Sequence, residues 1–260
     1  MFCIKVIDKN EFAVAVARDE DEVNLAVTRE YKEGDRILIE VSDAPVYAWL
    51  QLEAALGRSL VYLTEDYSFQ IPFGEKRINL SPKVFSGKTH LLTVRRARDF
   101  EINAYRNLAF NVNDCHVNNV CFPHASANIE TRGEAVFAAK NAIDGVTANS
   151  CHGEWPYDSW GINRDPKAAM KLDFGRDVTI DRIHMYLRAD FPHDSWWTKA
   201  SITFSDGSVM ELNLKKTASA QEFVFEPKTI RWLELSHLIK ADDASPFPAL
   251  TQIEVYGTEA

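Results

Sequence analysis

The sequence predicts an all-β protein made of two β-sandwich domains, and three observations support this fold class. Short apolar segments separated by turn residues recur along the chain, which is typical of antiparallel sandwiches and barrels. The chain has 260 residues, a length at the top of the single-domain range. A polar, Asn-rich stretch at 110–124 divides the segments into two sets. We therefore expect an N-terminal β-rich domain of unknown role at 1–110 and a second sandwich at 111–260.

The first half is expected to hold six strands and one helix. The segment 36–41 alternates apolar and polar residues like a half-buried strand, and the turn Glu33-Gly34-Asp35 precedes it. A helix is expected at 97–109, where apolar residues recur at mixed helical spacing and connect to the second half. The expected strands are 12–17, 23–28, 36–41, 46–52, 60–63 and 90–95.

The second half is expected to begin with a helix and continue as strands. The helix is predicted at 134–143, and Asp144-Gly145 ends it. Ser205-Asp206-Gly207-Ser208 is a hairpin turn between two strands. The expected strands are 168–174, 180–187, 198–204, 209–214, 222–225, 230–235 and 250–256. In such a sandwich the loops gather at the two ends, where binding residues can vary without disturbing the core.

Charge disfavours nucleic acid and membrane as partners. The formal net charge is −9, and a protein that binds phosphate backbones needs a concentrated basic face. The N-terminus is too short and too charged for a signal peptide, and no apolar run reaches the ~18 residues of a membrane span. The sequence therefore predicts a soluble, cytoplasmic protein, whose oligomeric state it leaves open.

The four cysteines do not form a zinc pattern. No Cys-x-x-Cys pair occurs among Cys3, Cys115, Cys121 and Cys151. A Cys115–Cys121 or Cys121–Cys151 bridge is compatible with the spacing. Free thiols are the favoured interpretation.

Five motifs in the second half occur in the order typical of one family. They are Asn141-Ala-Ile-Asp-Gly145, a Trp-containing loop, Ala169-Met-Lys-Leu-Asp-Phe-Gly175, Val178-Thr-Ile-Asp-Arg-Ile183 and Ala249-Leu-Thr-Gln-Ile-Glu-Val-Tyr-Gly257. Residues 112–260 thus resemble the discoidin, or coagulation-factor type C (F5/8 type C), family. This resemblance implies a galactose-binding-like jelly roll that binds carbohydrate, in a family that usually works outside the cell.

The resemblance also implies a structural calcium ion, held where the Asp-Gly turn meets the last strand. Calcium takes 6–8 oxygen ligands, and turns supply backbone carbonyls. The chain departs from the family at one position, because Gln252 stands where the family usually has Glu. The simple alternative is that Asp144-Gly145 only ends a helix. The ligands carried over are Asn141, Asp144, Val146, Asn149, Thr251 and Gln252.

Two loops, 150–161 and 188–197, hold four of the six tryptophans together with Arg, Asp, Glu and His. A saccharide has apolar C–H faces that stack on aromatic rings and hydroxyls that bind planar charged groups. The loops are therefore the predicted saccharide site. The alternative is structural: Trp155 or Trp160 in the core, one of Trp196 and Trp197 pointing inward, and an Arg188–Asp190 salt bridge. The predicted ligand-binding residues are His152, Glu154, Trp155, Arg188, Asp190, His193, Asp194, Trp196 and Trp197.

A third loop, 240–248, is stiffened by two prolines and Phe247, and Lys240, Asp242 or Asp243 is a candidate for additional contacts. The sequence favours a non-catalytic binding module, with no catalytic residues assigned. Two alternatives stay open. One is a carbohydrate-active hydrolase, in which His193-Asp194 or Glu154 acts with Asp190. The other is a protein–protein adaptor.

Overall fold

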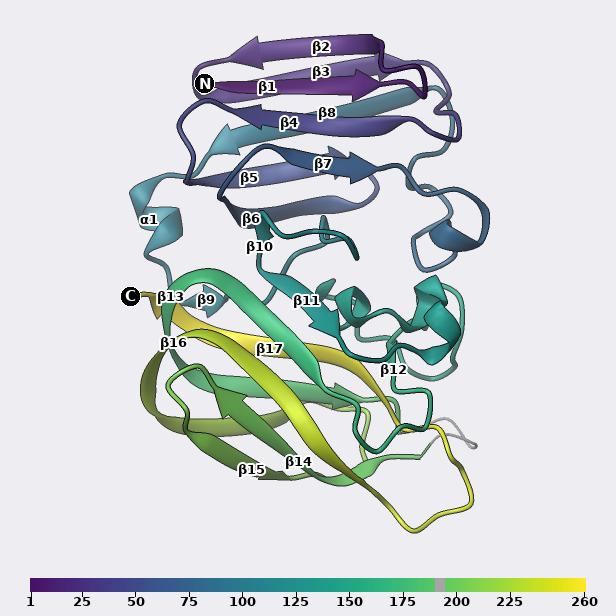
Figure 1. Cartoon of the computed structure of the whole chain (residues 1–260), viewed down its shortest axis with the longest axis vertical. Coiled ribbons are helices and arrows are strands. Elements are labelled where there is room, and N and C mark those ends of the chain that lie inside the picture. The colour runs from purple at the N-terminus through teal and green to yellow at the C-terminus, as the bar shows by residue number, and fades with distance from the viewer. Residues whose placement is uncertain (190–194) are drawn as a thin grey trace.

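The computed structural model describes residues 1–189 and 195–260. It confirms the predicted all-β fold, with one β-sandwich formed mainly by the first half of the chain and a second formed mainly by the rest (Figure 1). The two exchange short strands, because residues 106–107 pair in the second sandwich and residues 121–122 in the first. Among the described residues, no helix is long and apolar enough to cross a membrane. All four cysteines are free thiols, so neither candidate disulfide is formed.

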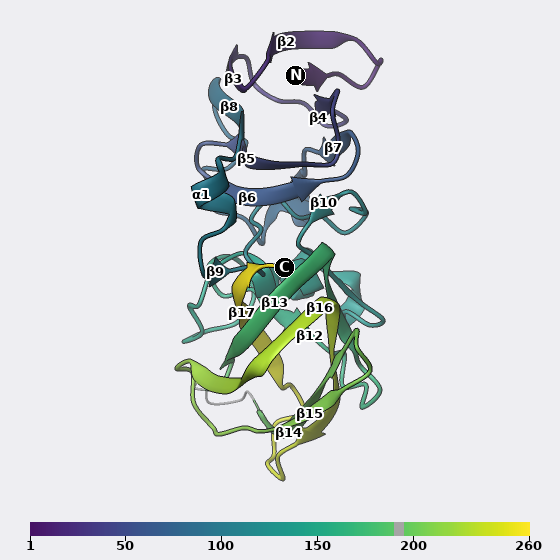
Figure 2. The ribbon, with the colours of Figure 1, turned by 90° about the vertical axis from the view of Figure 1, so that its left-hand side faces the viewer.

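The first sandwich consists of two antiparallel sheets, and Figure 2 shows β3 and β8 of one sheet on the left and β4 and β7 of the other on the right. One sheet has the order β2-β1-β4-β7, with β1 (Phe2–Ile7), β2 (Ala13–Asp19), β4 (Arg36–Val41) and β7 (Tyr67–Gln70). The other has the order β10-β6-β5-β8-β3, with β3 (Glu22–Thr28), β5 (Val46–Glu53), β6 (Gly57–Leu63), β8 (Thr89–Arg96) and β10 (Cys121–Phe122). A 3-10 helix, η1 (Gly74–Arg77), follows β7.

Alternating burial explains why most of these strands were predictable. In β3 every second side chain is buried, so one face of the strand packs on the core and the other meets water. The sequence prediction missed β1 and β7. Strand β1 lies in the middle of its sheet and is buried almost throughout, so its sequence shows no alternation.

The predicted helix at 97–109 is almost absent. Only one helical turn forms, α1 (Asp99–Ile102), and the chain then extends into β9 (Arg106–Asn107), which pairs with the last strand. Pairing with that strand takes the place of helical hydrogen bonds from Arg106 onward.

The second sandwich contains an eight-stranded sheet with the order β12-β17-β13-β16-β14-β15, in which β11 also pairs with β13. Strands β13 and β16 each unite two predicted strands, and irregular register at their middles allows them to bend. The strands are β11 (His124–Ala127), β12 (Trp160–Gly161), β13 (Met170–Leu187), β14 (Trp197–Phe204), β15 (Val209–Asn213), β16 (Gln221–Lys240) and β17 (Ala249–Glu259).

The predicted helix at 134–143 is replaced by short 3-10 turns, η2 (Thr131–Gly133), η3 (Ala135–Phe137) and η4 (Ala139–Ile143). Ala138 between the last two is extended, with ψ 148°. The side chain of Glu130 accepts a hydrogen bond from the Ala139 backbone N–H (2.8 Å). Packing therefore overrides the helix propensity of this alanine-rich segment, because Ala139, Ala142 and Ile143 are fully buried.

The two sandwiches are joined by a buried polar cluster and by the connecting segment. The Glu259 carboxylate pairs with Arg176 (2.7 Å) and Arg106 (2.6 Å) and accepts a hydrogen bond from the Tyr47 hydroxyl (2.7 Å). Burial alone would raise the pKa of Glu259, but its arginine partners lower it. Asn113 donates to the Leu50 carbonyl (2.9 Å), so the connecting segment is held against the first sandwich.

Candidate functional site

Two cavities are lined in part by residues that the sequence singled out. The first, called the loop-end cavity, lies where β13 ends and β17 begins and has a volume of about 150 Å³. The second, called the junction cavity, lies between the two sandwiches and has a volume of about 80 Å³. The loop-end cavity is lined by Thr131, Arg132, Phe137, His152, Gly161, Ile162, Asn163, Arg164, Arg188, Phe247, Pro248 and Ala249.

Arg188 is the most buried charged residue of the loop-end cavity. It follows the last residue of β13, and its backbone N–H donates to the Ala249 carbonyl (3.1 Å). Its guanidinium donates to the Ser159 hydroxyl (3.1 Å) and lies over the Phe137 ring, 5.8 Å from the centroid. Only 4% of Arg188 is exposed. An arginine stacked on a ring and surrounded by protein interacts strongly with a ligand, because little water screens it.

Gly161 allows the 161–164 segment to pack closely against Phe137 at one side of the cavity. A Cβ at this position would lie 3.1 Å from the ring of Phe137 and 2.7 Å from the hydroxyl of Thr131. That hydroxyl accepts a hydrogen bond from the Asn163 backbone N–H (2.9 Å). The absence of a side chain at Gly161 thus brings the ring and the 161–164 segment together.

Asn163 and Arg164 turn the chain with two successive positive φ angles, 50° and 61°. Asparagine tolerates this conformation, whereas an arginine is strained in it, at a cost of about 1 kcal/mol or more. This turn places the Arg164 guanidinium over the Phe247 ring, 5.7 Å from the ring centroid. Phe247 itself is 46% exposed, so an arginine and a ring lie together at the mouth of the cavity.

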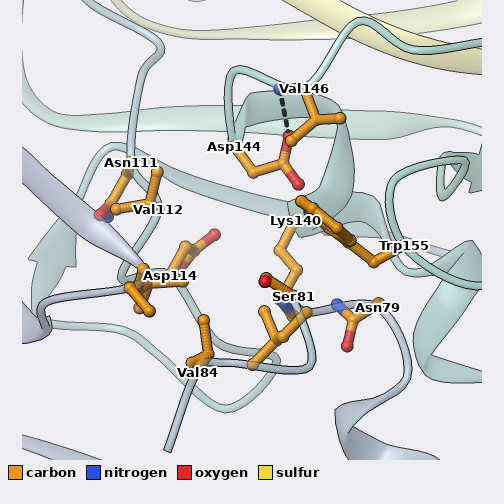
Figure 3. A pocket seen from close by; sticks show the side chains of 13 residues that line it. Asn79, Ser81, Val84, Asn111, Val112, Asp114, Lys140, Asp144, Val146 and Trp155 are labelled. Carbon is orange, nitrogen blue, oxygen red and sulfur yellow. Dashed lines mark hydrogen bonds between the residues drawn. The ribbon is translucent and has the colours of Figure 1, made fainter.

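The junction cavity receives the side chain of Trp155 (Figure 3). The Trp155 backbone N–H donates to the Ile78 carbonyl of the first sandwich (2.9 Å), which turns this part of the loop toward the domain junction. Lys140 and Asp144 lie beside the indole, and Asn79 approaches from the first sandwich. The lining residues are Ala55, Leu56, Asn79, Leu80, Ser81, Val84, Asn111, Val112, Asp114, Lys140, Asp144, Val146 and Trp155.

The predicted ligand-binding set is therefore divided. Arg188 and His152 line the same cavity, whereas Trp155 lines the other one and the exposed Glu154 lines neither. Asp190, His193 and Asp194 fall outside the described residues.

The neighbouring tryptophans belong to the core. Trp197 is fully buried and packs against Trp160, with ring centroids 6.3 Å apart. Trp196 is partly buried against the same core. The assignment of Trp197 to a ligand site is thus corrected, because strand alternation in β14 points its ring inward.

The third loop reaches the loop-end cavity through Phe247 rather than through its charges. Lys240 pairs with Asp243 (2.9 Å), which also accepts a hydrogen bond from the Ser195 hydroxyl (2.7 Å). Asp242 is exposed and lines neither cavity.

The hydrogen bonds of Gln252 and Asp144 show how well each of these predicted calcium ligands fits an ion. A glutamate at position 252 would accept a hydrogen bond with one oxygen and keep the other for a metal ion. Gln252 has a single side-chain oxygen, and it accepts the Gly145 backbone N–H (3.2 Å). The amide nitrogen of Gln252 is buried without a partner in the described part of the chain. This hydrogen bond takes one of the two lone pairs of the amide oxygen, so Gln252 still offers a neutral oxygen but lacks the carboxylate that the family usually has.

Asp144 fits a calcium site better, because a second carboxylate lies beside it. Asp158 is 3% exposed, and neither of its carboxylate oxygens has a hydrogen-bond partner among the described residues. Burial raises the pKa of Asp158 to about 6. Burial and the nearby charge of Asp158 raise the pKa of Asp144. A buried carboxylate beside a half-buried one favours a bound cation.

The other predicted ligands are arranged around this turn. The Val146 backbone N–H donates to Asp144 (2.8 Å), and the Asn149 amide donates to the carbonyls of Leu187 (3.3 Å) and Ala218 (3.1 Å). The Asn141 side chain is occupied by protein groups, which leaves only its carbonyl as a ligand, and the Thr251 hydroxyl is buried. No group of three His, Cys, Asp or Glu side chains suited to a metal ion occurs in 1–189 or 195–260.

Sequence reasoning missed several residues of the loop-end cavity. Arg132 and Phe137 lie far from Arg188 in sequence, and Phe137 was placed in the expected helix. The Ser159 backbone N–H donates to the Val136 carbonyl (3.0 Å), and the pairing of β12 with β17 brings that segment beside Ala249, to which Arg188 is bonded. The one local signal was the turn at Asn163-Arg164, where polar residues follow a buried strand.

The family match covers residues 119–255, more than half of the chain, and the family is described as Domain of unknown function (DUF7402). The chain belongs to this family. No curated protein matches it. The resemblance to the discoidin family stays a prediction.

Several solved structures of carbohydrate-binding modules are similar to this DUF7402 chain. Chitosan-binding module 1 of a chitosanase/glucanase from Paenibacillus sp. IK-5 is 19% identical, with 58% of this chain and 98% of that chain covered and a TM-score of 0.39. The family 32 module of NanJ from C. perfringens, in complex with galactose, is 19% identical, with coverages of 51% and 91% and a TM-score of 0.39. A fucose-binding module from Streptococcus pneumoniae is 13% identical, with coverages of 62% and 99% and a TM-score of 0.42. At this level of similarity, none of them bears on what this chain binds.

Proposed function

We propose that this protein is a non-catalytic carbohydrate-binding protein and that a saccharide binds in the loop-end cavity. The observation that carries the proposal is the convergence of two phenylalanine rings and a nearly buried arginine at the loop end of the second sandwich. Phe137 and Phe247 offer apolar faces for sugar C–H groups, and Arg188 offers hydrogen-bond donors for ring hydroxyls.

The size and position of the cavity agree with this role. Its volume of about 150 Å³ is small, which suits one sugar unit rather than a long chain. Its outer residues, such as Arg164 and Phe247, are exposed and lie in loops, so they can change without loss of the fold. A rigid wall made by Gly161, Phe137 and the proline-flanked Phe247 reduces the entropy lost on binding.

Calorimetric titration of the intact protein with a panel of mono- and disaccharides tests the proposal. Arg188→Ala is expected to weaken binding of the best sugar by about tenfold to a hundredfold, because hydrogen bonds to a charged group contribute about 1.5–3 kcal/mol. Arg18→Ala, which removes the same side chain from an exposed position on the first sandwich, should leave the affinity unchanged.

Two results would contradict the proposal. One is the absence of heat with every sugar of the panel. The other is equal affinity of the Arg188→Ala and wild-type proteins. Because Arg188 is buried, the melting temperature of the variant is measured in parallel, and Arg188→Lys, which keeps the charge but loses the planar fork, provides a second variant that must also bind more weakly.

We also propose that calcium binds at Asp144, with Asp158 as the second carboxylate. When bound, the ion would neutralise the paired carboxylates and fasten the Asp144-Gly145 turn to the 150–161 loop. The unpartnered oxygens of Asp158 in the described part of the chain support this assignment. A loss of thermal stability on chelation, abolished in Asp144→Ala, is the expected result.

A further inference from the structure

The described lining of the loop-end cavity is basic, whereas the chain as a whole is acidic. The chain has a net charge of −9, yet the described residues that line the cavity include three arginines and a histidine and no aspartate or glutamate. These basic residues come from four separate segments, at positions 132, 152, 164 and 188. Overall composition therefore does not account for their convergence.

The hydrogen-bonding capacity of the lining is equally one-sided. Guanidinium groups donate and never accept hydrogen bonds. Among the described lining side chains, acceptors come only from Thr131, Asn163 and the ring of His152, and the Thr131 oxygen already accepts the Asn163 N–H. A neutral sugar presents hydroxyls that donate as well as accept, so some of its hydroxyl protons would find no side-chain acceptor on the described part of this donor-rich wall. A group that only accepts hydrogen bonds matches it.

Arg164 is held at the mouth of the cavity by a strained backbone. Its φ is 61°, and its guanidinium lies over Phe247 without an ion pair to any described carboxylate. Arg132, by contrast, is paired with Glu134 (2.7 Å). Strain that fixes a charged group beside a ring is typical of a binding site.

We propose that the saccharide bound in the loop-end cavity carries an anionic group, either a carboxylate or a sulfate ester, and that Arg164 binds this group. The inference rests on the proposed function of the same cavity. The anionic group lies at the mouth against Arg164, and the sugar ring lies between Phe247 and the inner wall, where Arg188 meets its hydroxyls. The planar guanidinium of Arg164 presents two parallel N–H groups to two oxygens of the ligand.

Calorimetric titrations with matched sugars test the inference on the intact protein. The sets are D-glucuronic acid, D-glucose and D-glucose 6-sulfate, and the corresponding galacturonic acid, galactose and galactose 6-sulfate. In one of the two sets, we expect the acidic or the sulfated sugar to bind at least tenfold more tightly than the neutral parent. The better of the two anionic sugars identifies the anionic group. The preference should shrink as salt is raised, because Arg164 is exposed.

Variants connect the preference to Arg164. Arg164→Gln should reduce the affinity for the anionic sugar about tenfold and bring it close to that of the neutral sugar. Lys167→Gln removes one positive charge from an exposed position three residues away that does not line the cavity, and it should leave both affinities unchanged.

Three outcomes separate this inference from the proposed function. Binding of neutral sugars with an affinity equal to or above that of the anionic ones overturns the inference and leaves the proposed function intact. An anionic preference that persists in Arg164→Gln overturns the role of Arg164. No binding to any of the six sugars, nor to the wider saccharide panel, overturns both proposals.

Discussion

The loop-end cavity and the junction cavity differ in what their polar residues already do. In the loop-end cavity, the exposed Arg164 lies over a ring and pairs with no carboxylate of the described residues. In the junction cavity, Asp114 accepts hydrogen bonds from Cys115, Asn118 and Ala125 and pairs with His124. Side chains that are saturated by protein hold the domains together, whereas a donor such as Arg164 beside open space is suited to a ligand.

A single loop contributes to both regions. Between His152 and Trp155 the chain turns from one cavity to the other, and the backbone bond of Trp155 to Ile78 fixes that turn. A loop that is dense in aromatic and ionisable residues is therefore not one site. Part of it recognises a ligand, in our proposal, and part of it attaches the sandwich to its neighbour.

Calcium removal should give the largest effect and should affect only the junction side. A ligand at a hundredfold excess over its Kd stabilises a protein by about 2.7 kcal/mol. Chelation should therefore lower the melting temperature by several degrees, since 1 kcal/mol corresponds to roughly 2–4 °C for a chain of this size. Differential scanning calorimetry with and without a chelator measures this shift.

Asp144→Ala should abolish the sensitivity to the chelator, and saccharide affinity should be the same with and without calcium. A chelator that leaves the wild-type melting temperature unchanged would show that the paired carboxylates bind no calcium. A chelator that abolishes saccharide binding would show that the two regions are coupled, contrary to a division of roles between the two cavities.

A pair of aromatic substitutions tests the division directly. Phe247→Ala should weaken saccharide binding about threefold to tenfold, because a stacked ring contributes about 0.5–1.5 kcal/mol. Trp155→Ala should leave that affinity unchanged and destabilise the protein by about 1 kcal/mol, because its indole is 40% exposed and covers the junction cavity with the rest of its surface. Titration and denaturant unfolding of both variants distinguish the roles. The reverse result, with sugar binding lost in Trp155→Ala, would assign the site to the junction cavity.

The sequence predicted an element correctly where its own residues show a burial pattern, and failed where contacts with distant residues decide the structure. Strands such as β3 and β4 were predictable because buried side chains alternate with more exposed ones along each strand. The segment 134–143 was not, because its alanines favour a helix locally while burial of Ala139 and Ile143 selects tight turns. Burial of β1 on both faces removed its alternation.

The candidate site shows the same limit. Arg188 and His152 were predicted because their loops are rich in aromatic and ionisable residues. Phe137 and Arg164 reach the same cavity only through the pairing of β12 with β17 and through the close approach at Gly161. Neither contact can be recognised from the residues that are adjacent in the sequence. Asp158 was likewise missed, because its proximity to Asp144 is a product of the fold.

The smallest expected effect is a pH dependence on the junction side. His124 at the start of β11 pairs with Asp114 (2.8 Å). Burial alone would lower the pKa of His124, but the hydrogen bond and charge of Asp114 outweigh it and raise the pKa. Since the folded pKa lies above the unfolded value of about 6.5, the contribution is complete below that pH and is lost as pH rises through the folded pKa.

The free energy of unfolding should therefore fall by about 1 kcal/mol as the pH rises above 6 and His124 loses its proton. Saccharide affinity should not follow this change. His124→Gln should flatten that part of the profile. His116→Gln, which alters a histidine whose side chain is 74% exposed, should leave the profile unchanged. Denaturant unfolding between pH 5.5 and 8.5 measures all three proteins. An identical slope in the His124→Gln and wild-type proteins would mean that the His124–Asp114 pair does not contribute to the pH dependence of the junction.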